Sequence, residues 1–131
     1  MEILENFSLK KYNTFGIEAK AKQYVAVHST EELQEVLATH PNEKKFILGG
    51  GSNMLLTQDI DALVIHIDLK GKKIIDANDD FVWVEAQAGE NWHEFVLWTI
   101  DQNFGGLENM SLIPGNVGTT PVQNIGAYGA E

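Results

Sequence analysis

The sequence contains no cysteine, and this absence excludes several kinds of chemistry. Without thiols the chain has no disulfide framework, no cysteine nucleophile and no thiolate metal site. Basic residues are also few, at 9 against 19 acidic ones, which gives a formal net charge of −10. Nucleic acids and anionic membranes favour basic surfaces, so we expect neither as a partner. A phosphate ligand is not excluded, because backbone N–H groups bind phosphate without any basic side chain.

Long apolar runs and a targeting segment are missing as well. No apolar stretch approaches the roughly 20 residues of a membrane-spanning helix. Residues 1–5 are acidic and lack the basic segment and apolar run of a secretory signal. Hydrophobic residues make up 44% of the 131 positions, which is ordinary for a globular domain. We therefore expect one modest domain with its own core and a cytoplasmic location.

Apolar spacing and turn residues predict a mixed order of strands and helices. A first helix begins at the capping box Ser29–Glu32 and ends before Pro41. A second is predicted over 91–103. The residues that share its apolar face are Trp92, Phe95, Val96, Thr99 and Ile100. The predicted strands are 23–27, 45–48, 62–69 and a hairpin of 73–76 with 81–88. This order predicts an α+β fold, in which a small mixed sheet is covered by two helices.

A glycine run, Gly49–Gly51, follows the short apolar strand 45–48, and Ser52 and Asn53 come directly after it. Such a run can open backbone N–H groups toward a phosphate, with two side-chain donors beside them. It can equally be an ordinary tight loop, and the pattern alone does not separate the two interpretations. The spacing matches neither the Rossmann glycine fingerprint nor a Walker A loop.

Residues 113–129 form a second segment dense in glycine. Its free N–H groups and the adjacent hydroxyls of Thr119 and Thr120 can donate to anionic oxygens. The alternative is a structural loop with turns set by Pro114 and Pro121. No metal site is predicted, because the four histidines are scattered without metal-ligand spacing.

Three separated motifs resemble one enzyme family. They are Asn13-Thr14-Phe15-Gly16, the segment from Leu48 to Asn53, and the run from Gly106 to Glu131. In this order they are similar to the UDP-N-acetylenolpyruvoylglucosamine reductases, flavoenzymes that complete UDP-N-acetylmuramic acid for bacterial peptidoglycan. The resemblance covers nearly the whole chain, which would correspond to roughly the first third, or slightly more, of such an enzyme.

The resemblance implies a fold, a cofactor and a substrate. The fold is the FAD-binding domain of the vanillyl-alcohol oxidase group, with a first lobe over about 1–110 and the start of a second over about 111–131. The rest of that domain and the substrate domain would be absent. FAD is the implied cofactor, NADPH the hydride donor and a UDP-sugar the substrate. The family's catalytic serine, glutamate and arginine lie beyond the end of this chain, so we expect no catalytic residue here and no activity from residues 1–131 alone.

The resemblance also implies which residues bind. The flavin-binding residues of the first loop would be Gly49, Gly50, Gly51, Ser52, Asn53 and Met54. Those of the second would be Ile113, Pro114, Gly115, Thr119, Thr120, Val122 and Gly126. Tyr128 would lie near the substrate, and the motif Asn13–Gly16 near the adenine end of the cofactor, unless it is simply a turn with Phe15 as a core anchor.

Two other functions stay open at this point. One is a different FAD-dependent oxidoreductase of the same fold. Many of those attach the flavin through a histidine or cysteine, and this sequence has no cysteine and no histidine beside either glycine-rich loop. The other is a nucleotide-binding domain without catalytic activity.

Overall fold

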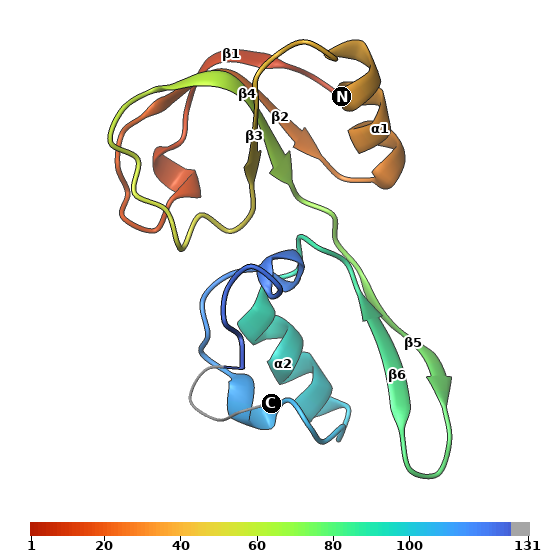
Figure 1. Ribbon diagram of the computed structural model, residues 1–131. Coiled ribbons are helices and arrows are strands. Elements are labelled where there is room, and N and C mark those ends of the chain that lie inside the picture. Colours follow the sequence, from red (N-terminus) through yellow and green to blue (C-terminus); the bar gives the residue numbers. More distant parts are fainter. Residues whose placement is uncertain (127–131) are drawn as a thin grey trace. The chain divides into compact units, whose positions relative to one another are not determined.

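The computed structural model describes residues 1–126 and divides the chain into two compact units, residues 1–69 and 70–131 (Figure 1). Each unit has apolar cores of its own, so each is described by itself. The lobe boundary expected near residue 110 concerns a longer protein and stays a prediction.

The first unit is built on a four-stranded sheet with the strand order β1-β2-β4-β3. Its strands are β1 (Leu4–Ser8), β2 (Lys20–Val27), β3 (Lys45–Leu48) and β4 (Ile60–Ile67). The edge strand β1 runs antiparallel to β2, whereas β2, β4 and β3 are parallel to one another. The mixed sheet is therefore confirmed, with β1 as a strand that the sequence pattern missed.

The central strand β4 is buried on both of its faces. Leu63, Val64 and Ile65 are at most 1% exposed, although they are consecutive and so point to alternating faces. Burial on two faces is typical of a strand that lies between parallel neighbours. Helix α1 (Thr30–Thr39) covers one face through Val36, and the segments around β3 and the N-terminal turn cover the other.

Helix α1 begins as the capping box predicts. The Ser29 hydroxyl accepts a hydrogen bond from the Glu32 N–H at 3.1 Å, and the Glu32 carboxylate reaches back to the His28 N–H at 2.7 Å. These bonds satisfy donors that a helix start leaves unpaired. The helix ends at Thr39, before Pro41, which confirms both of its predicted limits.

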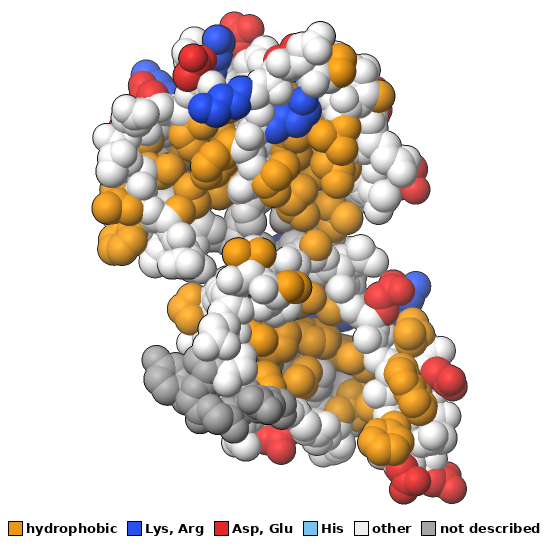
Figure 2. Space-filling view, in the orientation of Figure 1, with side chains coloured by type: hydrophobic (Ala, Val, Ile, Leu, Met, Phe, Trp, Pro, Cys, Tyr) orange, Lys and Arg blue, Asp and Glu red, His pale blue; other side chains and the backbone are white. Residues whose placement is uncertain are grey.

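The second unit begins with a two-stranded antiparallel ribbon of β5 (Lys72–Ala77) and β6 (Val82–Ala86). Its turn is closed by Asn78, whose side-chain oxygen accepts from the N–H groups of Asp80 and Phe81 at 2.9 and 2.7 Å. The predicted hairpin is confirmed. Apolar side chains also lie exposed along the ribbon in Figure 2, and they include Ile74, Ile75, Phe81 and Trp83.

Helix α2 (Trp92–Asp101) supplies the core of the second unit. Its buried residues are Trp92, Phe95, Val96 and Thr99. Ile100, expected on the same face, is instead 42% exposed, because the core extends only to Val84 and Ala86 of β6 and to the following loops. Within the second unit α2 packs against Val84 and Ala86 of β6, whereas within the first unit α1 packs on the four-stranded sheet.

The remaining elements of the described part, residues 1–126, are three short 3-10 helices, η1 (Lys10–Tyr12), η2 (Glu108–Met110) and η3 (Val117–Thr119). Within residues 1–126, no helix has the length and apolar character needed to span a membrane. The same residues bring together no group of three potential metal-binding side chains.

Candidate functional site

The first glycine-rich loop, residues 49–54, starts where β3 ends. Gly50 and Asn53 are exposed, whereas Gly51 is buried. Among the described residues, the N–H groups of positions 50–54 have no hydrogen-bond acceptor, and the side chains of Ser52 and Asn53 have no partner either. The loop thus offers a row of unpaired donors next to an exposed surface, which is what an anionic ligand requires.

Gly51 gives this loop a backbone conformation and a close contact that a residue with a side chain could not adopt without strain. Its φ is +67°, in the left-handed region, and a Cβ placed there would overlap the carbonyl oxygen of Tyr12. The Gly51 carbonyl in turn accepts a hydrogen bond from the Thr14 N–H at 3.1 Å. The buried glycine is therefore packed directly against the N-terminal turn.

That turn is organised by Asn13, which is only 7% exposed. Its side-chain nitrogen donates to the carbonyls of Leu9 and Ile17 at 2.8 and 3.0 Å, and its side-chain oxygen accepts from the Ile17 N–H at 2.9 Å. Because all three bonds close one turn, Asn13 makes a rigid support for Gly51. Phe15, by contrast, is 68% exposed, so it is not a core anchor. A place near the adenine stays a prediction.

The second glycine-rich loop, residues 113–126, uses its donors internally. The N–H groups of Asn116, Val117, Gly118, Thr119 and Thr120 all bond to acceptors within the second unit, at 2.8 to 3.2 Å. The expectation of free N–H groups between these glycines is therefore wrong for residues 116–120. The reason lies in the tertiary structure, because oxygen atoms of η3, of its N-cap Asn116 and of an adjoining segment accept the hydrogen bonds of these N–H groups.

The adjoining segment is 88–92, which leads from β6 into the first residue of α2. Gly118 donates its N–H to the Ala88 carbonyl at 2.9 Å, Val117 to the Glu90 carbonyl at 2.8 Å, and Trp92 to the Gly115 carbonyl at 3.0 Å. The two backbones lie so close that a Cβ on Gly118 would come within 2.7 Å of the Ala88 Cβ. Gly118 thus permits close packing of the backbone.

The two threonines differ in what their hydroxyls do. Thr119 Oγ1 donates to the Asn116 carbonyl at 2.8 Å and accepts from the Asn116 N–H at 3.2 Å, so it caps its own turn. Thr120 Oγ1 has no hydrogen-bond partner among residues 1–126. Of the two hydroxyls, that of Thr120 is the one available to a ligand.

The start of the second loop is fixed by the first turn of α2. The Trp92 indole N–H donates to the Met110 carbonyl at 2.8 Å, and His93 Nδ1 accepts from the Leu112 N–H at 3.0 Å. A histidine does therefore lie beside this loop, contrary to the reading of the sequence, because helix packing brings together positions 19 residues apart. Leu112 has a φ of +64° and is 78% exposed.

The expected binding residues are thus placed in two loops, one in each unit. In the second loop Ile113 is half-buried and Val122 is 88% exposed. Tyr128, expected near a substrate, lies outside the described residues. The sequence named Asn13 in a motif but did not reveal that it supports Gly51, and it gave no sign of Glu90 as a partner of Val117. Their burial is what identifies them, and no local pattern reveals it.

A diphosphate fits the first loop. All nine basic residues of the chain are lysines, so no guanidinium is present to clamp a phosphate. The unpaired N–H groups of residues 50–54 and the side chains of Ser52 and Asn53 are donors that need no positive charge. The donor set therefore suits the diphosphate of a dinucleotide such as FAD.

The chain is similar to curated proteins that share one name. Over all 131 residues the chain is 82% identical to a UDP-N-acetylenolpyruvoylglucosamine reductase of Flavobacterium johnsoniae, of which it spans 39%. It is 50% identical over 134 aligned residues to the enzyme of that name from Pseudomonas fluorescens, again spanning 39% of it. The chain thus corresponds to well under half of these relatives, and the expected resemblance is confirmed.

A solved structure shares the fold. The crystal structure of UDP-N-acetylenolpyruvylglucosamine reductase from Thermus caldophilus aligns with a TM-score of 0.64 over 91% of this chain and 40% of that one, at 24% identity. This likeness confirms the expected fold class. A family model described as FAD binding domain matches residues 21–131, which is most of the chain. The chain therefore belongs to the FAD-binding domain family.

Proposed function

We propose that the full-length protein containing this chain is an NADPH-dependent flavoenzyme that reduces UDP-N-acetylglucosamine enolpyruvate to UDP-N-acetylmuramate. The observation that carries the proposal is the loop of unpaired donors at residues 50–54, in a chain that matches an FAD-binding family and is 82% identical to part of one such reductase. We also propose a cytoplasmic location for the reaction, where water-soluble nucleotide substrates of this kind would be available.

The chain's own residues would bind and orient the cofactor. Bound FAD supplies the hydride chemistry of such reductases. The N–H groups of residues 50–54 would donate to the diphosphate oxygens, and Asn13 would keep Gly51 in its left-handed conformation. The second loop would act as a preformed wall, since its backbone donors are already satisfied. The Thr120 hydroxyl would be its free polar group.

No residue of this chain is proposed to transfer a proton to the substrate. Residues 1–131 alone are accordingly proposed to be inactive, and to bind FAD weakly, because a flavin held between two walls draws its affinity from both. Association must also offset lost translational and rotational freedom, on the order of 4–15 kcal/mol. The isolated chain, with one wall largely missing, would make too few contacts with FAD for their binding energy to offset that loss.

The test is to purify the full-length product of the gene. Yellow flavin absorbance is expected, followed by oxidation of NADPH that depends on UDP-N-acetylglucosamine enolpyruvate. A colourless protein that cannot take up FAD would contradict the proposal and favour a nucleotide-binding domain without catalysis. A yellow protein that ignores the UDP-sugar would favour another oxidoreductase of the same fold.

A further inference from the structure

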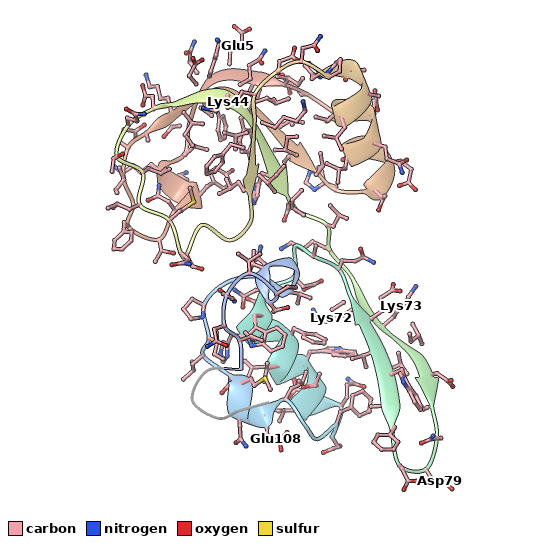
Figure 3. All side chains as sticks on the ribbon, viewed as in Figure 1. Glu5, Lys44, Lys72, Lys73, Asp79 and Glu108 are labelled. Carbon is pink, nitrogen blue, oxygen red and sulfur yellow. The ribbon has the colours of Figure 1, made fainter. Side chains whose placement is uncertain are left out.

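Glu90 is a buried carboxylate, and within residues 1–126 no other acidic residue is as buried. It is 7% exposed and lies in the connection between β6 and α2. One carboxylate oxygen accepts from the Gly71 N–H at 2.7 Å, and the other is 3.2 Å from the Lys72 ammonium. Figure 3 labels Lys72 and its neighbour Lys73 at the start of β5. The side chain of Glu90 thus ties its segment to the beginning of the ribbon.

The main chain of the same segment holds the second glycine-rich loop. The Glu90 carbonyl accepts from the Val117 N–H at 2.8 Å, and the Ala88 carbonyl accepts from the Gly118 N–H at 2.9 Å. On the other side, the Lys70 ammonium donates to the Gly89 carbonyl. Residues 88–90 therefore lie between two anchors, the ribbon on one side and the loop on the other.

We propose that Glu90 is a positioning residue for the flavin. Through the backbone of residues 88–90, Glu90 would fix the position and orientation of the Gly115–Thr120 loop. The inference rests on the proposed function, because it assumes that this loop lines bound FAD. Glu90 itself is not a ligand of the cofactor. Each of its carboxylate oxygens already has a partner, Gly71 or Lys72, and it is the Glu90 carbonyl that reaches the loop.

The arrangement requires a charged carboxylate. Burial raises the pKa of Glu90, but the Gly71 N–H and the ammonium groups of Lys72 and Lys70 outweigh burial and hold that pKa below its usual value. A lowered pKa means that Glu90 stabilises the fold fully above the unfolded pKa, about 4.3 for a glutamate. That stabilisation is lost as the pH falls through the folded pKa. The loop should therefore loosen in acid.

The chain offers a matched control for the test. Glu85 on β6 pairs with Lys73 at 3.1 Å, but both side chains are much more exposed, at 45% and 66%. Exposed pairs contribute little to stability, whereas loss of a buried partner leaves the other group unsatisfied. Glu90→Gln and Glu85→Gln thus make the same chemical change opposite neighbouring lysines of β5, once in a buried pair and once in an exposed pair.

The experiment compares these variants in the full-length protein by amide hydrogen exchange and FAD titration. For Glu90→Gln we expect the Val117 and Gly118 amides to exchange about tenfold faster and FAD to bind about tenfold more weakly, with Glu85→Gln unchanged. In wild type, the protection factors of these two amides, corrected for the intrinsic pH dependence of exchange, should fall as the pH falls through the folded pKa of Glu90. In Glu90→Gln this response should be absent.

A second pair of variants covers the case in which Glu90→Gln does not fold. Lys72→Met should produce the same changes in smaller measure, and Lys73→Met should not. Equal exchange and equal FAD affinity in the buried-pair and exposed-pair variants, with wild type binding FAD, would overturn the positioning role alone. A wild-type protein that takes up no FAD would overturn both this role and the proposed function.

Discussion

Residues 49–54 and residues 113–126 are both rich in glycine, yet their backbone donors are used differently. In the first loop the N–H groups of positions 50–54 are unpaired among the described residues, whereas in the second those of positions 116–120 are all bonded internally. One glycine of each loop also has a different structural role. Gly51 adopts a left-handed backbone, while Gly118 permits the close approach of Ala88.

This difference separates two uses of one residue type. A loop with free donors is suited to bind charge, and it must be braced from behind, as Asn13 and Tyr12 brace Gly51. A loop with satisfied donors is suited to offer shape, because its backbone no longer needs a ligand to complete its hydrogen bonds. We therefore expect substitutions in the first loop and its brace to affect both stability and FAD binding. In the second loop, we expect one substitution to affect stability and another to affect FAD binding.

The largest effect is expected for Gly51→Val. A side chain at φ +67° that overlaps the Tyr12 carbonyl should reduce the free energy of unfolding by about 3 kcal/mol and abolish measurable FAD binding. Gly105→Val is the matched control, because a Cβ there meets no atom within 4 Å. Gly71 is unsuitable as a control, since its φ is +135° and its N–H supports Glu90. Thermal unfolding and flavin titration of the full-length protein measure both quantities, and similar losses at 51 and 105 would contradict the close packing.

A smaller effect is expected for Asn13→Ala, which removes three hydrogen bonds from a buried turn without touching the loop itself. Unfolding should become easier by about 2 kcal/mol, and FAD affinity should fall because Gly51 loses its support. Asn42→Ala, at an exposed position, serves as the control. If Asn13→Ala unfolded more easily but bound FAD normally, Asn13 would stabilise the unit without bracing the loop.

The smallest effects are expected for the two threonines, and they should differ in kind. Thr119→Val removes a turn cap and should lower stability by about 1 kcal/mol. Thr120→Val removes an unpaired hydroxyl, so stability should hardly change while FAD binds about tenfold more weakly. Chemical denaturation and flavin titration of both variants would show the contrast. Its reversal would mean that Thr119, not Thr120, contacts the cofactor.

Local sequence chemistry predicted the regular elements well. The Ser29–Glu32 capping box, the break before Pro41 and the hairpin closed at Asn78 each act within a few residues, and each was confirmed. Strand β1 was missed because Glu5 and Asn6 interrupt its apolar pattern, and Asn6 has a φ of +52°. Ile100 was wrongly expected to be buried, because helical spacing shows which residues share a face of the helix but not how far the core extends along that face.

The sequence by itself determined the family, the order of strands and helices, and the two loops in which binding residues gather, since motifs and periodicity are local. Only the tertiary structure decided which donors in those loops are free. The partners of Val117 and Gly118 lie far earlier in the sequence, at Glu90 and Ala88, and the support of Gly51 lies at Tyr12 and Asn13. A backbone N–H is the same in every residue except proline, so its availability depends on what the fold places opposite it.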